Sequence, residues 1–196
     1  MALEDKLKWD ERHRQKMIPD APVKLVTDFS RLAPGNIALD LACGTGRNSK
    51  YLASEGFEVD ALDISSVAIG SLQGIKGIHT KEVDFDTYDL PKSHYDLIVC
   101  TYFLERRLFP QIIEALKEGG IFIYETFVYH PDNEMSPSKQ RFLLSEGELE
   151  ATFDETLDLL HIREEWTFSI KGDKMMKGAL VGRKKAGGMT VEDFWS

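Results

Sequence analysis

A short glycine-containing segment follows the first strongly apolar strand pattern of the chain. Residues 37–48 read IALDLACGTGRN, so an apolar strand leads into a turn of small residues and then into a helix. Gly44 and Gly46 let the backbone approach a ligand closely and take dihedral angles that a β-carbon resists. In open α/β sheets, ligands bind at the carboxyl ends of the strands, beside helix amides. The segment therefore predicts a ligand site at this turn.

Two acidic residues accompany the glycine turn. Asp63 follows it at close to the ~20-residue spacing at which a carboxylate can accept hydrogen bonds from ribose hydroxyls. Asp40 lies inside the strand, where it can organise the turn, cap backbone amides or meet a cationic ligand electrostatically. Ser49 stands where a dinucleotide fingerprint would carry its third glycine. The pattern indicates a nucleoside-containing ligand, and Asp40 and Ser49 count against a dinucleotide.

The elements that must position this turn alternate along the chain. Short apolar patterns predict strands at 37–42, 57–62, 79–83, 95–101 and 121–127. Helical patterns lie at 47–54, 65–73 and 108–117, and two more precede the first strand, at 3–17 and 22–32. Strands that alternate with helices in this way predict an α/β fold with a parallel sheet.

The chain changes character after the fifth strand. Residues 129–141 are rich in proline and polar residues, which predicts a long loop or lid. Ser145 and Glu148 fit a capping box, so a short helix is expected to end near residue 153. Segments 157–170 and 174–183 read as strands joined by a tight turn, and they must be antiparallel because no crossover helix fits between them. Residues 187–196 form a tail.

Composition narrows the class of protein. The 196 residues are 42% hydrophobic and 29% charged with a net charge of −9, as in a single globular domain. The acidic balance disfavours nucleic acid and anionic membranes as partners. The amino-terminal residues do not resemble a signal peptide, and no apolar run approaches the ~18 residues of a membrane span. Two cysteines suit a reducing compartment, so a cytoplasmic protein is expected.

The ordered set of motifs resembles class I S-adenosylmethionine-dependent methyltransferases. DLACGTG at 40–46 is similar to their acid-x-small-x-Gly-x-Gly motif, and the resemblance continues at 63–64, 83–85, 95–100 and 116–120. It covers residues 9 to about 183. It implies a Rossmann-like, doubly wound sheet of seven mostly parallel strands, with a terminal antiparallel hairpin and helices on both faces. It also implies one methyltransferase domain over 1–186, in which 1–33 cover the cofactor site.

The resemblance further implies S-adenosyl-L-methionine as the cofactor and a role for individual residues. Asp63 would bind the ribose, Asp84 the adenine amino group, and Arg14 the methionine carboxylate through a charge-assisted bond. Trp9 belongs to a segment similar to one that folds over the cofactor in small-molecule methyltransferases. The predicted cofactor-binding set is Trp9, Arg14, Asp40, Ala42, Cys43, Gly44, Gly46, Asn48, Asp63, Ile64, Asp84, Phe85, Cys100 and Thr101.

The expected reaction is direct displacement of a methyl group onto a small-molecule acceptor. Methyltransferases of nucleic-acid bases carry Asn/Asp-Pro-Pro-aromatic after the fourth strand, whereas residues 100–103 here are CTYF. Tellurite- and thiopurine-type enzymes are similar in their amino-terminal segment and short insertions. An RNA or protein acceptor and a non-catalytic S-adenosylmethionine-binding module remain alternatives. So does an NAD-dependent oxidoreductase, although Asp40 and Ser49 count against it.

The catalytic groups are left open. A hydroxyl or amine acceptor would need a base, for which Glu125, Tyr129 and His130 are candidates, whereas a thiolate needs little more than orientation. The spacing of histidines, cysteines and carboxylates predicts no metal site. The two cysteines are interpreted as small buried hydrophobes. Arg106 and Arg107 are interpreted as solvated, with an anionic substrate as the alternative partner of Arg107. A monomer or homodimer is expected.

Overall fold

A seven-stranded sheet organises the molecule. The computed structural model describes residues 3–15, 19–134, 140–169 and 171–187. In it the strand order is β3-β2-β1-β4-β5-β7-β6, in which β1 to β5 are parallel and β7 pairs antiparallel with both β5 and β6. The strands are β1 (Ile37–Leu41), β2 (Glu58–Asp63), β3 (Ile78–Glu82), β4 (Tyr95–Thr101), β5 (Leu116–Phe127), β6 (Leu157–Phe168) and β7 (Lys174–Lys184). The predicted fold class is confirmed.

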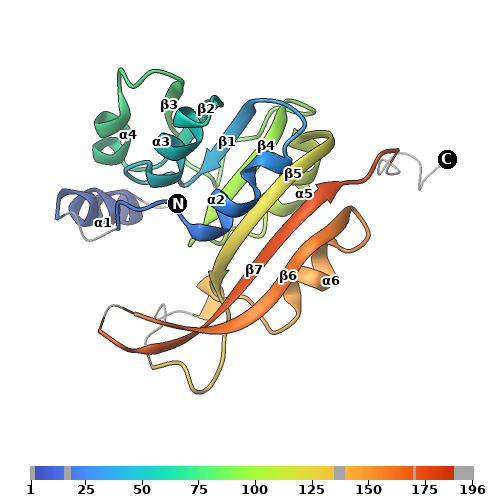
Figure 1. Ribbon diagram of the computed structural model, residues 1–196. Coiled ribbons are helices and arrows are strands. Elements are labelled where there is room, and N and C mark those ends of the chain that lie inside the picture. The colour runs from blue at the N-terminus through green and yellow to red at the C-terminus, as the bar shows by residue number, and fades with distance from the viewer. Residues whose placement is uncertain (1–2, 16–18, 135–139, 170, 188–196) are drawn as a thin grey trace.

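Helices cover both faces of this sheet (Figure 1). They are α1 (Leu3–Arg14), α2 (Lys24–Phe29), η1 (Ser30–Leu32), α3 (Arg47–Ser54), α4 (Ser66–Leu72), α5 (Leu108–Ala115), η2 (Gln140–Phe142) and α6 (Glu148–Phe153). Apolar residues of α2, α3 and α4 pack on one face, and those of α5 and α6 pack on the other. No helix within the described residues is long and apolar enough to cross a membrane.

The strand order reverses at β1, which lies between β2 and β4. Chain connections leave β1 and β4 toward opposite faces of the sheet, so a crevice forms beyond their carboxyl ends. Within β1, Ala38 packs on the face of α2 and α3, whereas Leu39 and Leu41 pack on the face of α5 and α6. Asp40 shares the face of Ala38 because strand side chains alternate. The sheet therefore directs this acid toward α3.

The end of α5 differs from the prediction. A helix was expected over 108–117, but α5 ends at Ala115, and Leu116 already pairs with Tyr95 as the first residue of β5. Leu116 is fully buried, so its apolar side chain suits the core equally well from a strand or from a helix. Gly119, at φ +74°, instead lies where the ladder is interrupted before Ile121.

The predicted terminal hairpin is confirmed, and its turn lies where the sequence indicated. Ser169 accepts a hydrogen bond from the Gly172 amide at 2.9 Å, and Gly172 takes a left-handed φ of +90°. Residue 170, the predicted last residue of the first strand, lies outside the described residues, as do residues 135–139 of the predicted loop. At the predicted capping box, the Ser145 amide donates to Glu148 Oε2 at 2.8 Å.

Helix α1 is attached to the rest of the molecule through polar contacts of Asp10 and of Lys6, which donates to the Ile64 carbonyl and pairs with Glu82. Asp10 Oδ1 accepts hydrogen bonds from Ser65 Oγ at 2.6 Å and from the Val67 amide at 3.2 Å, and Ser66 Oγ lies 3.4 Å from Oδ2. Burial raises the pKa of Asp10, but these donors and Lys6 together hold it below its usual value. The three buried apolar clusters contain no residue of α1 among those described. Polar contacts therefore determine where this helix docks.

The Asp10→Ala substitution should release α1 and leave the rest of the fold intact. It removes the acceptor for the buried Ser65 hydroxyl and the partly buried Val67 amide, at a cost of about 1–3 kcal/mol. Hydrogen exchange of the α1 amides should therefore speed up by roughly tenfold or more, with little change in Tm. Glu4→Ala, at an exposed position of the same helix, is the matched control. Unchanged α1 exchange in the Asp10 variant would contradict this account of docking.

Candidate active site

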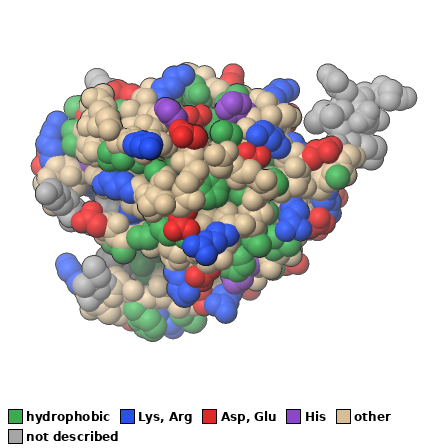
Figure 2. Space-filling view, turned by 45° about the horizontal axis from the view of Figure 1, so that its top comes forward, with side chains coloured by type: hydrophobic (Ala, Val, Ile, Leu, Met, Phe, Trp, Pro, Cys, Tyr) green, Lys and Arg blue, Asp and Glu red, His purple; other side chains and the backbone are tan. Residues whose placement is uncertain are grey.

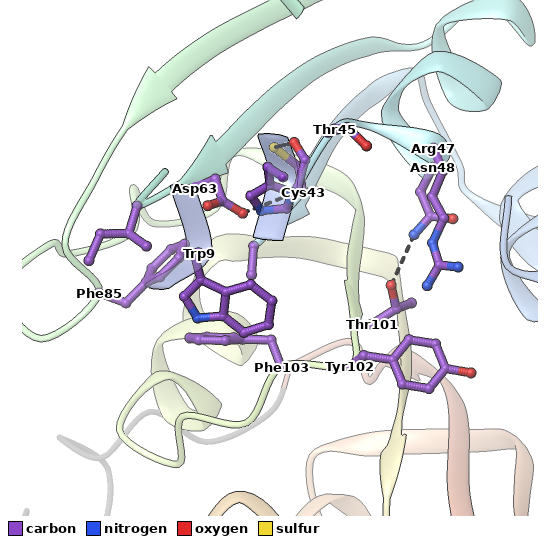
Figure 3. Close-up of a pocket in the computed structure, with 14 residues that line it drawn as sticks. Trp9, Cys43, Thr45, Arg47, Asn48, Asp63, Phe85, Thr101, Tyr102 and Phe103 are labelled. Carbon is purple, nitrogen blue, oxygen red and sulfur yellow. Dashed lines mark hydrogen bonds between the residues drawn. The ribbon is translucent and has the colours of Figure 1, made fainter. Parts of the chain in front are cut away.

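A cavity opens at the carboxyl ends of β1, β2 and β4, beneath α1 (Figure 3). Its open space, including the mouth, is about 670 Å³. Asp63, Phe85 and Trp9 lie at one side in this view, and Arg47, Thr101 and Tyr102 lie at the other. The lining residues are Trp9, His13, Ala42, Cys43, Gly44, Thr45, Arg47, Asn48, Asp63, Ile64, Phe85, Thr101, Tyr102 and Phe103.

The glycine turn, residues 42–46, lines the cavity between these two sides. Ala42, Gly44 and Gly46 all take positive φ angles, of +54°, +54° and +78°. A β-carbon on Gly46 would lie only 2.5 Å from a methyl carbon of Leu72, so α4 packs directly on this glycine. At Gly44 a β-carbon would come within 3.2 Å of the His13 ring. Glycine is thus required here both for dihedral angle and for close approach.

Asp63, at the end of β2, holds the turn in place. Its Oδ2 accepts the Gly44 amide at 2.8 Å, and its Oδ1 accepts the Ser65 amide at 2.8 Å. The side chain is only 6% exposed but still reaches the cavity lining. Burial raises the pKa of Asp63, while these amides and His13 act against that shift. The carboxylate retains lone pairs that a hydroxyl donor in the cavity could use.

His13 approaches the same region from α1. Its ring stacks on Trp9, with 5.9 Å between ring centroids, and both residues line the cavity. Its Nδ1 is buried and has no hydrogen-bond partner among the described residues. Burial lowers the pKa of the imidazole against the attraction of Asp63 and Asp10, so the ring is neutral near pH 7. A buried ring nitrogen without a partner is unusual in a folded protein.

Asp40 supports the turn from behind and is absent from the described cavity lining. Its Oδ2 accepts the Ser49 hydroxyl at 2.6 Å, and the Ser49 backbone also donates to this carboxyl. The structure therefore matches the amide-capping interpretation of Asp40, in which it orders the first turn of α3. Burial raises the pKa of Asp40 to about 7, although the bonds from Ser49 oppose the shift.

The other side of the cavity is built around the end of β4. Asn48 donates to Thr101 Oγ1 at 3.1 Å and accepts the Val23 amide at 3.0 Å, which ties α3 to β4 and to the start of α2. Tyr102 takes a left-handed φ of +58°, a strained angle for a residue with a large side chain. Arg47 lies over its ring, 5.3 Å from the ring centre.

The predicted binding residues divide into two groups. Nine line the cavity: Trp9, Ala42, Cys43, Gly44, Asn48, Asp63, Ile64, Phe85 and Thr101. Five do not: Arg14, Asp40, Gly46, Asp84 and Cys100. Arg14 is exposed and pairs with Glu11 at 3.4 Å, and Asp84 accepts the Asp86 amide at 3.0 Å in the turn after β3. Gly46 and Cys100 are adjacent in the sequence to lining residues but are not part of the described lining.

Five lining residues were not predicted: His13, Thr45, Arg47, Tyr102 and Phe103. Thr45 and Arg47 belong to the glycine segment itself, and Tyr102 and Phe103 follow directly on the strand that ends at Thr101. His13 is four residues after Trp9, so helical spacing places both on one face. The same spacing turns Arg14 away from the cavity.

Two other sequence interpretations can be compared with the structure. Burial raises the pKa of both Cys43 and Cys100, which keeps the thiols neutral, in agreement with their interpretation as small hydrophobes. Arg106 and Arg107 are exposed to solvent, as interpreted, and both also bind groups of the protein. Arg106 pairs with Glu148 of α6, and Arg107 donates to the carbonyl oxygens of Phe85 and Tyr88. Both arginines therefore fasten loops beside the cavity.

The Asp40→Asn substitution should change how stability depends on pH. Folded Asp40 keeps its proton up to about pH 7, whereas in the unfolded chain it ionises near its ordinary value of 3.8. The folded state thus binds more protons between these values, and the native protein loses stability as pH rises through that window. Asparagine cannot ionise and keeps an oxygen for Ser49. Each pKa unit is equivalent to about 1.4 kcal/mol.

Denaturant unfolding at several pH values measures this effect. Relative to the native protein, the Asp40→Asn variant should gain stability from about pH 4 to about pH 7 and show no further gain above that range. Asp28→Asn, which alters an acid on the surface of α2, should show no such trend. A stability difference that does not vary with pH in the Asp40 variant would rule out a raised pKa at this position.

Comparison with known proteins agrees with the fold and the motifs. The family model described as "Tellurite resistance protein TehB" matches residues 18–174. A "Probable S-adenosyl-L-methionine-dependent methyltransferase TehB" of Haemophilus influenzae is 29% identical over 179 residues, which are 82% of this chain and 61% of that protein. A "Ubiquinone biosynthesis O-methyltransferase" of Burkholderia vietnamiensis is 29% identical over 136 residues, 60% of this chain and 56% of that protein.

Solved structures support the same assignment. The crystal structure of TehB from Haemophilus influenzae superposes with a TM-score of 0.75 at 25% identity, covering 90% of this chain and 67% of that chain. The chain spans about three fifths of the length of the first curated relatives that it matches. The resemblance to tellurite-type methyltransferases, stated from the motifs, is confirmed. Since the family model covers most of the sequence, the chain belongs to the TehB family.

Proposed function

We propose that the protein is an S-adenosyl-L-methionine-dependent methyltransferase that methylates a small-molecule acceptor by direct displacement. The observation that carries the proposal is the position of Asp63. Its carboxylate lines the cavity and accepts a hydrogen bond from the Gly44 amide of the glycine turn. TehB membership and the names of the relatives support the same activity. We also propose a single domain over 1–186, a cytoplasmic location, and a monomer or homodimer.

The residues of the cavity suit this cofactor. Asp63 offers carboxylate oxygens to vicinal hydroxyls, and Ile64 and Phe85 beside it offer apolar surface for a flat base. The unpartnered Nδ1 of His13 is a polar group in need of a partner at the same side. The His13 ring packs closely over Gly44, so the base end of a ligand would lie beside both residues. These features favour a nucleoside at this end and an aliphatic chain beneath the turn.

When bound, S-adenosylmethionine supplies an electrophilic methyl group on a sulfonium sulfur. The protein contributes by holding the donor and acceptor in line, which can account for much of the rate. Trp9 and His13 of α1 cover the cavity and restrict the access of water. Thr101 and Tyr102, at the end of β4, border the space where an acceptor would lie.

The acceptor is best matched by a nucleophile that needs none of the three bases expected from the sequence. The described lining includes none of the three candidate bases, Glu125, Tyr129 and His130. Glu125 instead accepts the Tyr102 hydroxyl at 2.6 Å and pairs with Lys177 at 3.2 Å. A thiolate or another soft atom with a free lone pair suits such a site, and the matched family is described by tellurite resistance. On the face in Figure 2, basic and acidic side chains are interspersed, which disfavours a nucleic-acid substrate.

Calorimetric titration with S-adenosylmethionine, S-adenosylhomocysteine and NADH tests the proposal. Both sulfur nucleosides should bind, and Asp63→Asn should weaken them by about ten- to a hundredfold, since hydrogen bonds to charged groups contribute roughly 1.5–3 kcal/mol. Glu58→Gln, an exposed acid at the opposite end of β2, is the matched control and should bind like the native protein.

The other outcomes separate the alternatives. Binding of NADH alone would contradict the proposal in favour of an oxidoreductase, and binding of none would contradict it altogether. If the sulfur nucleosides bind, transfer of a labelled methyl group to thiol and metalloid acceptors excludes a non-catalytic module. Thermal melting of the Asp63 variant shows whether the turn still folds without the full carboxylate.

A further inference from the structure

Strand β6 forms one outer edge of the sheet (Figure 1). Among the described residues it pairs only with β7, so the backbone N–H and C=O groups along its other side have no strand partner. After a register shift between Leu159 and His161, residues 161–168 pair with β7 without interruption. This edge segment contains no proline, the residue that often protects an exposed strand edge. It is therefore able to accept a further strand.

Apolar side chains lie on one face of the edge segment. Ile162 is 39% exposed, Phe168 is 65% exposed, and Trp166 between them is half-buried. Ile162 lies opposite Leu180 of β7, so these alternate positions share the sheet face that α5 and α6 cover. Apolar surface beside an unpaired strand edge favours association with a partner strand.

Charges of both signs accompany these apolar side chains. Arg163 and Glu165 lie on the opposite face of the sheet, where their charged groups are 2.9 Å apart and face solvent. Glu164, between them in sequence, lies on the apolar face, and its Oε1 accepts the Gly147 amide at the start of α6 at 2.8 Å. The edge segment thus offers one cation and one anion on the face that α6 does not cover.

A second copy of this chain matches the edge segment in one register. Opposite residues of an antiparallel pair lie on the same face of a sheet, so a two-fold axis between two β6 strands must pass through a residue. With the axis at Glu164, Arg163 of each copy lies opposite Glu165 of the other. Ile162 of each copy then lies opposite Trp166 of the other. By symmetry, each of these contacts forms twice.

The neighbouring registers match less well. An axis at Arg163 places two guanidinium groups opposite each other, and an axis at Glu165 places two carboxylates opposite each other. An axis at Ile162 leaves Arg163 opposite His161, without a carboxylate. The register centred on Glu164 has one like-charge contact, between the two copies of Glu164 itself. The bond to Gly147 holds each of these carboxylates at its own α6, which limits that repulsion.

We propose that the protein forms a two-fold symmetric homodimer in which two β6 edges pair antiparallel in the register centred on Glu164. Backbone hydrogen bonds between the strands join the two sheets, and the Arg163–Glu165 pairs select the register. A self-complementary arrangement of charges identifies a second copy, rather than a different protein, as the partner. The proposal does not depend on the reaction proposed above, so its test needs no substrate.

Two charge reversals test this dimer by sedimentation over a range of protein concentrations. Arg163→Glu and Glu165→Arg each place like charges opposite one another at two symmetric positions, so each should weaken the dimer by about tenfold or more. In an equimolar mixture of the two variants, acids of one chain lie opposite arginines of the other. Heterodimers should therefore form at about the native strength.

Matched variants separate this interface from a general effect of charge. Lys50→Glu makes the same change in net charge as Arg163→Glu, at an exposed position of α3, and should dimerise like the native protein. Glu164→Gln removes the like-charge contact at the axis and keeps an oxygen for the Gly147 amide. It should tighten the dimer severalfold. This gain tests the register even if a charge reversal impairs folding.

Other results would overturn the proposal. A native protein that sediments as a monomer at all concentrations has no such interface. A dimer that both charge reversals leave intact uses another surface. If each reversal weakens the dimer at a native melting temperature but the mixture does not restore it, the register centred on Glu164 is wrong.

Discussion

The Asp63 carboxylate joins two turns that come from different strands. One oxygen accepts the Gly44 amide of the turn after β1, and the other accepts the Ser65 amide of the turn after β2. Ser65 in turn caps α4 and donates to Asp10 of α1. A single side chain thus fixes the glycine turn, the start of α4 and, through Ser65, the docking of α1. The cavity has a defined shape because these three pieces cannot move independently.

Three aspartates lie around this junction, and the pKa of each is shifted by its own surroundings. Asp10 is hydrogen-bonded strongly enough that its pKa falls, whereas burial raises the pKa of Asp40 and of Asp63. His13 lies against this group of acids as a neutral ring. The permanent positive charge of the described lining is at the far side, on Arg47. The cavity is therefore electrically polarised along its length, with acceptors at one end and a donor fork at the other.

Patterns of neighbouring residues in the sequence predicted the fold and the side of the cavity that contains Asp63. The order of apolar strands and helices, and the spacing of Asp63 from the glycine turn, depend on residues close in sequence, so pattern reasoning recovered them. The end of α5 could not be predicted in this way, because Leu116 is apolar and suits either periodicity until its pairing with Tyr95 is known. The position of Arg14 outside the described cavity lining could not be predicted for a related reason. Arg14 is adjacent to His13 in sequence, but one residue rotates a helical side chain by about 100°, and the exposed position follows from that rotation. The support of Arg47 by Tyr102 and Glu125 joins residues from three elements, for which the sequence carries no signal.

The position of β7 between β5 and β6 has a consequence for how the chain folds. β6 pairs only with β7 among the described strands, and β7 is the last of them along the chain. Until residue 184 has left the ribosome, β5 presents an unpaired edge and β6 has no place in the sheet. Assembly of this part of the sheet must therefore wait until β7 has been synthesised, and until then the exposed edge of β5 is a point at which a nascent chain is open to aggregation.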